Sequence, residues 1–189
     1  MEKKWKENNI VDFIYSIIIE NSKKNNKIII GIDGASGVGK TTISKLLKEK
    51  DKNIEILHTD DFQNNIKEKI SIFKKLNKKS EIYQKGWFDS DKIKKEIEYF
   101  KNNSKNKILL IDGIFLLNNN IFGNYIDKII YIKMNEELLK KRKLDRLKIN
   151  KLDKKENYLL FSELLDVSWK NYMKESNIEE KSDIVINIK

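Results

Sequence analysis

The stretch from residue 34 to residue 42, Gly-Ala-Ser-Gly-Val-Gly-Lys-Thr-Thr, constrains the fold of this chain more than any other segment. It fits G-x-x-x-x-G-K-[ST], in which glycines let the backbone turn its N–H groups inward around phosphate oxygens. Such a loop needs a strand before it and a helix after it. Residues 27–33 are a short β-branched run, and residues 41–50 place Ile43, Leu46 and Leu47 on one helical face. The sequence therefore predicts a P-loop that binds nucleotide phosphates.

The residues of this loop have distinct expected roles. The helix that begins near Thr41 adds its positive N-terminal end. Lys40 would reach the β- and γ-phosphates, and the Thr41 hydroxyl would ligate Mg²⁺. The predicted nucleotide-binding residues are Gly34, Ala35, Ser36, Gly37, Val38, Gly39, Lys40, Thr41 and Thr42.

The rest of the chain alternates between strand and helix patterns. Alternation of this kind implies an α/β fold, here a P-loop NTPase-type parallel sheet with helices on both faces and right-handed connections. No linker, repeat or low-complexity tail divides the chain, so residues 1–189 are predicted to form one domain, with 1–26 as a helical N-terminal extension. The expected strands are 27–33, 53–58, 107–112, 128–133 and 183–188, and the expected helices are 8–22, 41–50, 64–79, 89–101, 136–151 and 154–175.

Composition excludes several classes of protein. A length of 189 residues fits one domain that needs no disulfide or structural metal. With 0 Cys, the chain has no thiol catalysis, zinc-thiolate site or disulfide framework. The apolar runs are too short to cross a bilayer, and the first residues lack the apolar core of a signal peptide. We therefore expect a cytoplasmic protein with no membrane contact.

The formal net charge of +10 would suit a nucleic-acid partner, but its distribution argues against one. The excess comes from Lys spread over almost every segment and mixed with Asn and Ile, residues that share AT-rich codons. Nucleic acid is therefore an unlikely partner. The two Arg residues of the chain, Arg142 and Arg146, stand four positions apart and share a helix face. Because Arg offers a rigid fork of donors that matches phosphate oxygens, we expect a helical lid over about residues 136–152. The alternative is a surface helix laced with ion pairs.

Carboxylates follow two of the expected strands. Ligands of an open α/β sheet sit beyond the carboxyl ends of its strands. Asp112 ends one strand and would hold Mg²⁺ together with Thr41. Asp60 and Asp61 follow another strand, and Asp60 is our candidate for the base that accepts the proton of a hydroxyl acceptor. Asp61 is the alternative base, and either residue could instead cap a helix. His58 is expected to be a core residue at a strand end.

Together these segments resemble the uridine kinase/phosphoribulokinase-like group of P-loop kinases, in order and spacing, over most of residues 27–188. Residues 58–62 (HTDDF) are similar to the family's Asp-x-Phe segment, which maps its general base onto Asp60. Residues 87–91 (WFDSD) are similar to its aromatic-Asp segment, which maps a substrate-binding carboxylate onto Asp89. Residues 111–113, 137–146 and 182–185 resemble the acidic strand end, the arginine-bearing lid and the last strand.

The resemblance implies a kinase that uses ATP and Mg²⁺ to phosphorylate a hydroxyl group of a small molecule. The implied catalytic residues are Asp60, Lys40, Arg142 and Arg146. Asp89 would bind the acceptor, and Trp87 and Tyr83 are candidates to stack against it, although aromatic residues at such spacing are often core.

Two features bear on the acceptor. Uridine kinases carry a β-hairpin that helps to clamp the pyrimidine, but residues 92–107 here resemble one helix and a short turn. No Arg precedes residue 142 to grip an acceptor phosphate, which favours an unphosphorylated nucleoside or similar alcohol. The oligomeric state is not predicted.

Two alternative functions remain. Residues 150–153 (NKLD) fit the guanine-reading N-K-x-D pattern of GTPases, but they follow a charged helical run, and residues 112–115 break D-x-x-G. A nucleic-acid-acting P-loop kinase or ATPase that uses the Lys-rich surface is the other alternative.

Overall fold

The computed structural model describes residues 7–23, 25–64, 87–118, 121–123, 125–149 and 155–188. Five strands form one parallel sheet in the order β2-β3-β1-β4-β5. The predicted fold class is confirmed. The strands are β1 (Ile28–Gly34), β2 (Ile54–His58), β3 (Ile108–Gly113), β4 (Lys128–Met134) and β5 (Ile184–Ile188).

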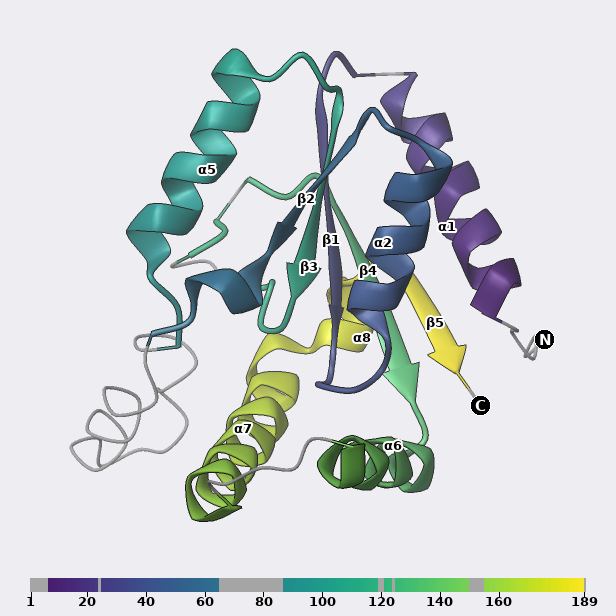
Figure 1. Ribbon diagram of the computed structural model, residues 1–189. Helices are drawn as coiled ribbons and strands as arrows, with labels where there is room; N and C mark the ends of the chain where they lie inside the picture. The colour runs from purple at the N-terminus through teal and green to yellow at the C-terminus, as the bar shows by residue number, and fades with distance from the viewer. Residues whose placement is uncertain are drawn as a thin grey trace.

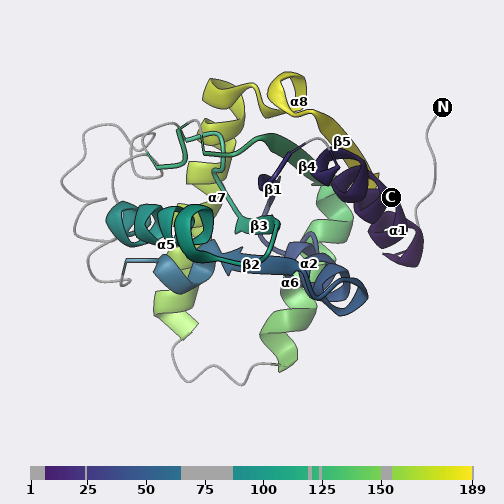
Figure 2. The same ribbon diagram turned by 90° about the horizontal axis from the view of Figure 1, so that it is seen from above.

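Helices cover both faces of the sheet (Figures 1 and 2). One face carries α1 (Glu7–Ser22) and α2 (Lys40–Lys50), whose apolar residues pack on the sheet in one core cluster. The other face carries α5 (Ser90–Asn103), α7 (Lys155–Ser176) and α8 (Ile178–Lys181) in a second cluster. The helix α6 (Glu136–Ile149) lies beyond the carboxyl ends of the strands (Figure 1).

The sequence pattern explains these layers. The central strands β1 and β3 are buried at every position, which is why they are continuous apolar runs. In α1, Ile10, Ile14 and Ile18 recur at helical spacing and are almost completely buried. The N-terminal helix, which we expected to be an extension, thus belongs to the main core.

Most expected elements occur within one or two residues of their predicted ends. The expected helix over 64–79 lies outside the described residues. Two short elements were not predicted: α8 and the 3-10 turn η1 (Thr59–Phe62), which follows β2 directly. No helix among the described residues has the length and apolarity that a membrane span requires.

The strand order determines which loops lie next to each other. Because parallel strands end at the same edge of the sheet, the last residues of β1, β3 and β2 lie side by side. The register pairs Asp33 with Gly113 and His58 with Asp112. The P-loop, η1 and the turn after β3 therefore begin at neighbouring strand ends on one edge of the sheet.

Candidate active site

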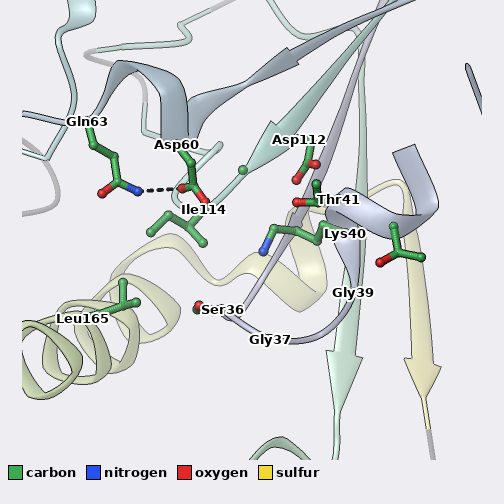
Figure 3. Close-up of a pocket in the computed structure, with 12 residues that line it drawn as sticks. Ser36, Gly37, Gly39, Lys40, Thr41, Asp60, Gln63, Asp112, Ile114 and Leu165 are labelled. Atoms are coloured by element: carbon green, nitrogen blue, oxygen red, sulfur yellow. Dashed lines mark hydrogen bonds between the residues drawn. The ribbon is translucent and has the colours of Figure 1, made fainter. Parts of the chain in front are cut away.

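A cavity of about 290 Å³ lies against the loop that joins β1 to α2. The backbone of this loop takes conformations that favour glycine: φ is 99° at Gly37 and 103° at Gly39. Gly39 is also the N-cap of α2. The first turn of α2 therefore opens toward the cavity, as an anion-binding helix start requires. The cavity is lined by Ser36, Gly37, Gly39, Lys40, Thr41, Thr42, Asp60, Gln63, Asp112, Gly113, Ile114 and Leu165 (Figure 3).

Lys40 is held close to its own loop. Lys40 is buried, with only 8% of its surface exposed. The ammonium donates hydrogen bonds to the carbonyl oxygens of Gly34 at 2.8 Å and Ala35 at 3.1 Å. A phosphate that entered the cavity would offer this cation stronger acceptors than neutral carbonyl groups.

Thr41 and Asp112 both line the cavity (Figure 3). The Asp112 side chain is 3% exposed, and its Oδ2 lies 3.0 Å from Nδ1 of His58. Hydroxyl and carboxylate oxygens suit Mg²⁺, which commonly takes one or two protein ligands and completes its shell with phosphates and water. Among the described residues, no group of three His, Cys, Asp or Glu could hold a metal. Thr41 and Asp112 therefore offer oxygen atoms of the kind that Mg²⁺ takes as ligands, and their role as metal ligands stays a prediction.

Asp60 reaches the same cavity from η1, opposite the P-loop (Figure 3). It is exposed, and its Oδ1 accepts a hydrogen bond from Nε2 of Gln63 at 2.6 Å. The neighbouring carboxylate, Asp61, is also exposed but does not line the cavity. Of the two carboxylates that the sequence offered as the candidate base, only Asp60 therefore lines the cavity.

A close approach between η1 and β3 brings the two carboxylates into one cavity. A Cβ atom on Gly113 would lie 2.5 Å from Cγ2 and 2.9 Å from Cβ of Thr59. Only a residue without a side chain fits there, because these distances are shorter than van der Waals contact. Gly113 follows Asp112 and Thr59 precedes Asp60, so this contact fixes the distance between the two acids.

The predicted lid helix packs over the loop. Nη1 of Arg142 donates a hydrogen bond to the carbonyl oxygen of Val38 at 3.3 Å. Lys143, on the same helix, forms an ion pair of 2.6 Å with Asp166 of α7. The side chain of Arg146 lies outside the described residues.

The structure reveals a buried carboxylate that the sequence analysis missed. Asp33, at the end of β1, is 0% exposed and accepts three hydrogen bonds. The donors are Gly34 N at 2.7 Å, Leu116 N at 2.9 Å and the Tyr172 hydroxyl at 2.5 Å. Burial raises the pKa of Asp33, although the hydrogen bonds from Tyr172 and Leu116 and the charge of Lys40 oppose that shift. Burial also raises the pKa of Tyr172, and the nearby Asp33 adds to the effect. Asp33, like Asp112, is an acid at the end of an apolar run, and this is the sequence signal that could have identified it.

Comparisons with known proteins agree with this geometry. Residues 30–181 match the family model described as AAA domain. The chain belongs to that family. Adenylate kinase of Mesomycoplasma hyopneumoniae (strain 7448) is 31% identical over 147 residues, which cover 72% of this chain and 66% of that relative. The chain thus spans slightly less than two thirds of the relative's length.

Solved structures show which fold this AAA-domain chain has. A possible uridine kinase from Bacillus stearothermophilus matches it with a TM-score of 0.64 at 15% identity, over 93% of this chain and 96% of that one. D-glycerate 3-kinase from Cryptococcus neoformans var. grubii matches with a TM-score of 0.61 at 10% identity, over 94% and 95%. At these identities the likeness concerns the fold, which is that of the uridine kinase-like P-loop kinases.

Two predicted substrate contacts do not reach the cavity of this AAA-domain chain. Trp87 is 0% exposed, and its ring packs edge-on against Phe115 at 5.5 Å, as a core side chain does. Its role in stacking on a substrate stays a prediction. Asp89 caps α5: its carboxylate accepts from Lys92 N and pairs with the Lys92 ammonium, which lowers its pKa. A substrate role for Asp89 stays a prediction. Tyr83 lies outside the described residues.

The contact between Gly113 and Thr59 gives a first test. Gly113→Ala should lower the free energy of unfolding by about 1–3 kcal/mol, because the new methyl group overpacks the site. Urea denaturation measures the change. Thr59→Ala removes the Cγ2 atom that the methyl group would meet, so the double variant should recover part of the loss. A Gly113→Ala protein as stable as wild type would contradict the proposed close packing.

The buried Asp33 gives a second test, on the pH dependence of stability. The folded-state pKa of Asp33 is raised above the ordinary value of 3.8, so between these two pKa values the folded chain holds more of this proton than the unfolded chain does. The stability contributed by Asp33 is thus present below about pH 4 and is lost as pH rises through the folded-state pKa. We expect Asp33→Asn to gain stability relative to wild type as pH rises through that window. Urea denaturation at several pH values measures it, with the exposed Asp61→Asn as control. A stability difference that does not change with pH would contradict the prediction.

Proposed function

We propose that this chain transfers the γ-phosphoryl group of Mg-ATP to a hydroxyl group of a small molecule, and that the acceptor is a nucleoside or similar alcohol. The observation that carries the proposal is the position of Asp60. Its carboxylate lines the same cavity as Lys40 and Thr41 and enters from the opposite side. A phosphate bound at the loop would lie between a cation and a candidate base.

The nucleotide end of the cavity supports phosphate binding. The backbone of the loop and the start of α2 supply N–H donors and a positive dipole end. The Lys40 ammonium can exchange its carbonyl partners for phosphate oxygens. Thr41 and Asp112 would hold Mg²⁺, which when bound neutralises charge on the phosphates. The preference for ATP rests on the kinase fold.

The acceptor end supports proton transfer. As the acceptor oxygen forms its bond to the γ-phosphorus, the bond from that phosphorus to the bridging oxygen of ADP breaks. The acceptor proton passes to the Asp60 carboxylate. The Gln63 amide, which donates to Oδ1 of Asp60, fixes the orientation of that carboxylate.

The helix α7 and the turn after β3 supply the apolar walls of the cavity, and α6 lies close to the loop. Leu165 of α7 and Ile114 add apolar surface, which limits the access of water and thus favours transfer to the acceptor over hydrolysis. Arg142 lies within hydrogen-bond distance of the loop carbonyl of Val38. From there a small movement of α6 would bring its guanidinium to the transferred phosphoryl group.

The similarity to adenylate kinase raises a second candidate acceptor, a nucleoside monophosphate. Such an acceptor carries a phosphate that the protein must grip. The chain has no Arg before residue 142, and the described residues that line the cavity include one cation, Lys40, which faces the nucleotide loop. We therefore favour an acceptor without a phosphate group.

A panel of acceptors tests the proposed function. ADP release from Mg-ATP should rise with one class of nucleoside, sugar or other small alcohol, and not with nucleoside monophosphates. Stimulation by nucleoside monophosphates would show that the acceptor carries a phosphate group and would contradict the proposed acceptor class. Stimulation only by short RNA or DNA would favour the nucleic-acid alternative. No stimulation by any acceptor would contradict the kinase proposal. Replacement of ATP by GTP in the same assay tests the nucleotide preference.

Substitution of the candidate base tests its role. Asp60→Asn should keep ATP affinity and reduce phosphoryl transfer on the order of 10²-fold or more, as for the loss of a general base. Asp61→Asn is the matched control, because it removes the adjacent charge outside the cavity and should leave transfer near wild type. Equal loss in both variants, or full activity of Asp60→Asn, would exclude Asp60 as the base.

A further inference from the structure

The Asp33 carboxylate does not line the cavity, yet it is tied to the cavity's principal cation. It holds the N–H of Gly34 through Oδ1. The carbonyl oxygen of the same Gly34 accepts a hydrogen bond from Lys40. Both polar backbone groups of the first loop residue are thus fixed, one by Asp33 and one by Lys40.

Gly34 has little freedom to respond to a change in these partners. A Cβ atom on this residue would meet the backbone oxygen of Ile132 at 2.6 Å, so the Gly34 backbone lies directly against β4. A shift of its N–H group would therefore move its carbonyl group, and with it the anchor of Lys40. The orientation of the loop start depends on what holds Asp33.

One of the three donors to Asp33, the Tyr172 hydroxyl, comes from α7. The Tyr172 hydroxyl donates to Oδ2 at 2.5 Å and accepts from Leu117 N at 2.9 Å. Tyr172 is 1% exposed, and its ring lies 5.2 Å from Phe115 and 5.4 Å from Trp169. Packing thus fixes the hydroxyl, and the hydroxyl fixes one oxygen of Asp33.

The same hydroxyl fixes a second part of the site. Leu116 and Leu117 belong to the turn that follows β3, and their N–H groups end on Asp33 and Tyr172. This turn begins just after Asp112 and Gly113, which line the cavity. Asp33 and Tyr172 therefore hold the P-loop and the turn beyond the metal carboxylate in one arrangement.

Burying the polar groups of Asp33 and Tyr172 lowers the stability of the fold. Burial raises the pKa of Asp33, so ionisation of the carboxyl group is unfavourable there. A pair of apolar side chains of similar volume would avoid that cost, as it does for other buried polar groups. A stability disadvantage of this kind is typical of groups that serve a site.

We propose that Asp33 and Tyr172 are positioning residues for nucleotide binding, which hold the P-loop in its phosphate-accepting shape from α7. The proposal rests on the proposed binding of ATP, but it does not depend on the acceptor. It assigns α7 a role in the nucleotide site. The ion pair between Asp166 and Lys143 connects α7 to α6, and Asp166 precedes Tyr172 by about two helical turns. The loop and the lid helix thus share one support.

Equilibrium titration with a fluorescent ATP analogue in the presence of Mg²⁺ tests the proposal. Tyr172→Phe keeps the buried ring and removes one hydroxyl, and it should weaken nucleotide affinity about tenfold, the size of effect expected for a lost hydrogen bond to a charged group. Tyr131→Phe is the matched control. Tyr131 is also buried, and its hydroxyl lies 4.0 Å from the Met173 sulfur. It should change affinity less than about twofold, in line with the loss of a weak contact.

Asp33→Asn separates positioning from stability. An amide presents its oxygen to only one side, so it cannot accept both from Gly34 N and from the Leu116 N and Tyr172 hydroxyl pair. Nucleotide affinity should fall about tenfold, whereas stability relative to wild type rises with pH. If Asp33 had a purely structural role, the variant's nucleotide affinity would fall only under conditions in which its free energy of unfolding also falls. This variant also serves if Tyr172→Phe does not fold.

The outcomes are distinct. Wild-type affinity in both Tyr172→Phe and Asp33→Asn would overturn the positioning role and leave the proposed kinase function intact. An equal loss in Tyr131→Phe would likewise overturn it, because the effect would then belong to the core in general. Absence of ATP binding by the wild-type chain would overturn both the positioning role and the proposed function. Weaker binding in the two variants, with the control unchanged, would support it.

Discussion

The site depends on the register of three parallel strands. Because β3 lies between β2 and β1, the end of each outer strand meets the end of β3 directly. His58 pairs with Asp112 on one side, and Asp33 pairs with Gly113 on the other. A slip of one residue in either ladder would turn every side chain of the slipped strand to the opposite face. The strands β1 (Ile28–Gly34) and β3 (Ile108–Gly113) are buried at every position, so their register is fixed. That register determines which residues stand next to each other at the cavity.

Close packing converts that alignment into fixed distances. The β3 end approaches η1 so closely at Gly113 that a side chain there would collide with Thr59. The same tightness recurs where Gly34 lies against Ile132. Interiors packed at this density transmit small displacements and do not absorb them. Asp60, Asp112 and the loop are therefore held at fixed distances from one another, although they come from three separate segments of the chain.

The sequence was informative where the pattern is local and less so where contacts are distant. The P-loop, the strands and most helices were predictable because each depends on neighbouring residues. The position of Asp60 and Asp112 at one cavity was predictable because parallel strands end at a common edge. The contact between Asp33 and Tyr172 spans 139 positions, and no local pattern announces it. For Trp87 the sequence left a substrate contact and a core position open, because its packing against Phe115 depends on a segment distant in the sequence. The pairing of His58 with Asp112 required the strand order, which the sequence did not supply.

The use of charge in this chain supports a division between surface and site. The Lys residues that the structure describes lie mostly on exposed faces, where pairs such as Lys50 with Asp12 contribute little to stability. Asp33, at 0% exposure, and Lys40, at 8%, are instead buried beside the loop. Each is costly alone in a medium of low polarity, but together they stabilise each other, and Lys40 opposes the rise in the pKa of Asp33. Nucleotide phosphates would draw Lys40 away from the Gly34 carbonyl and leave the hydrogen bonds of Asp33 to hold the loop. The buried acid is thus best understood as the fixed partner of a cation that must move.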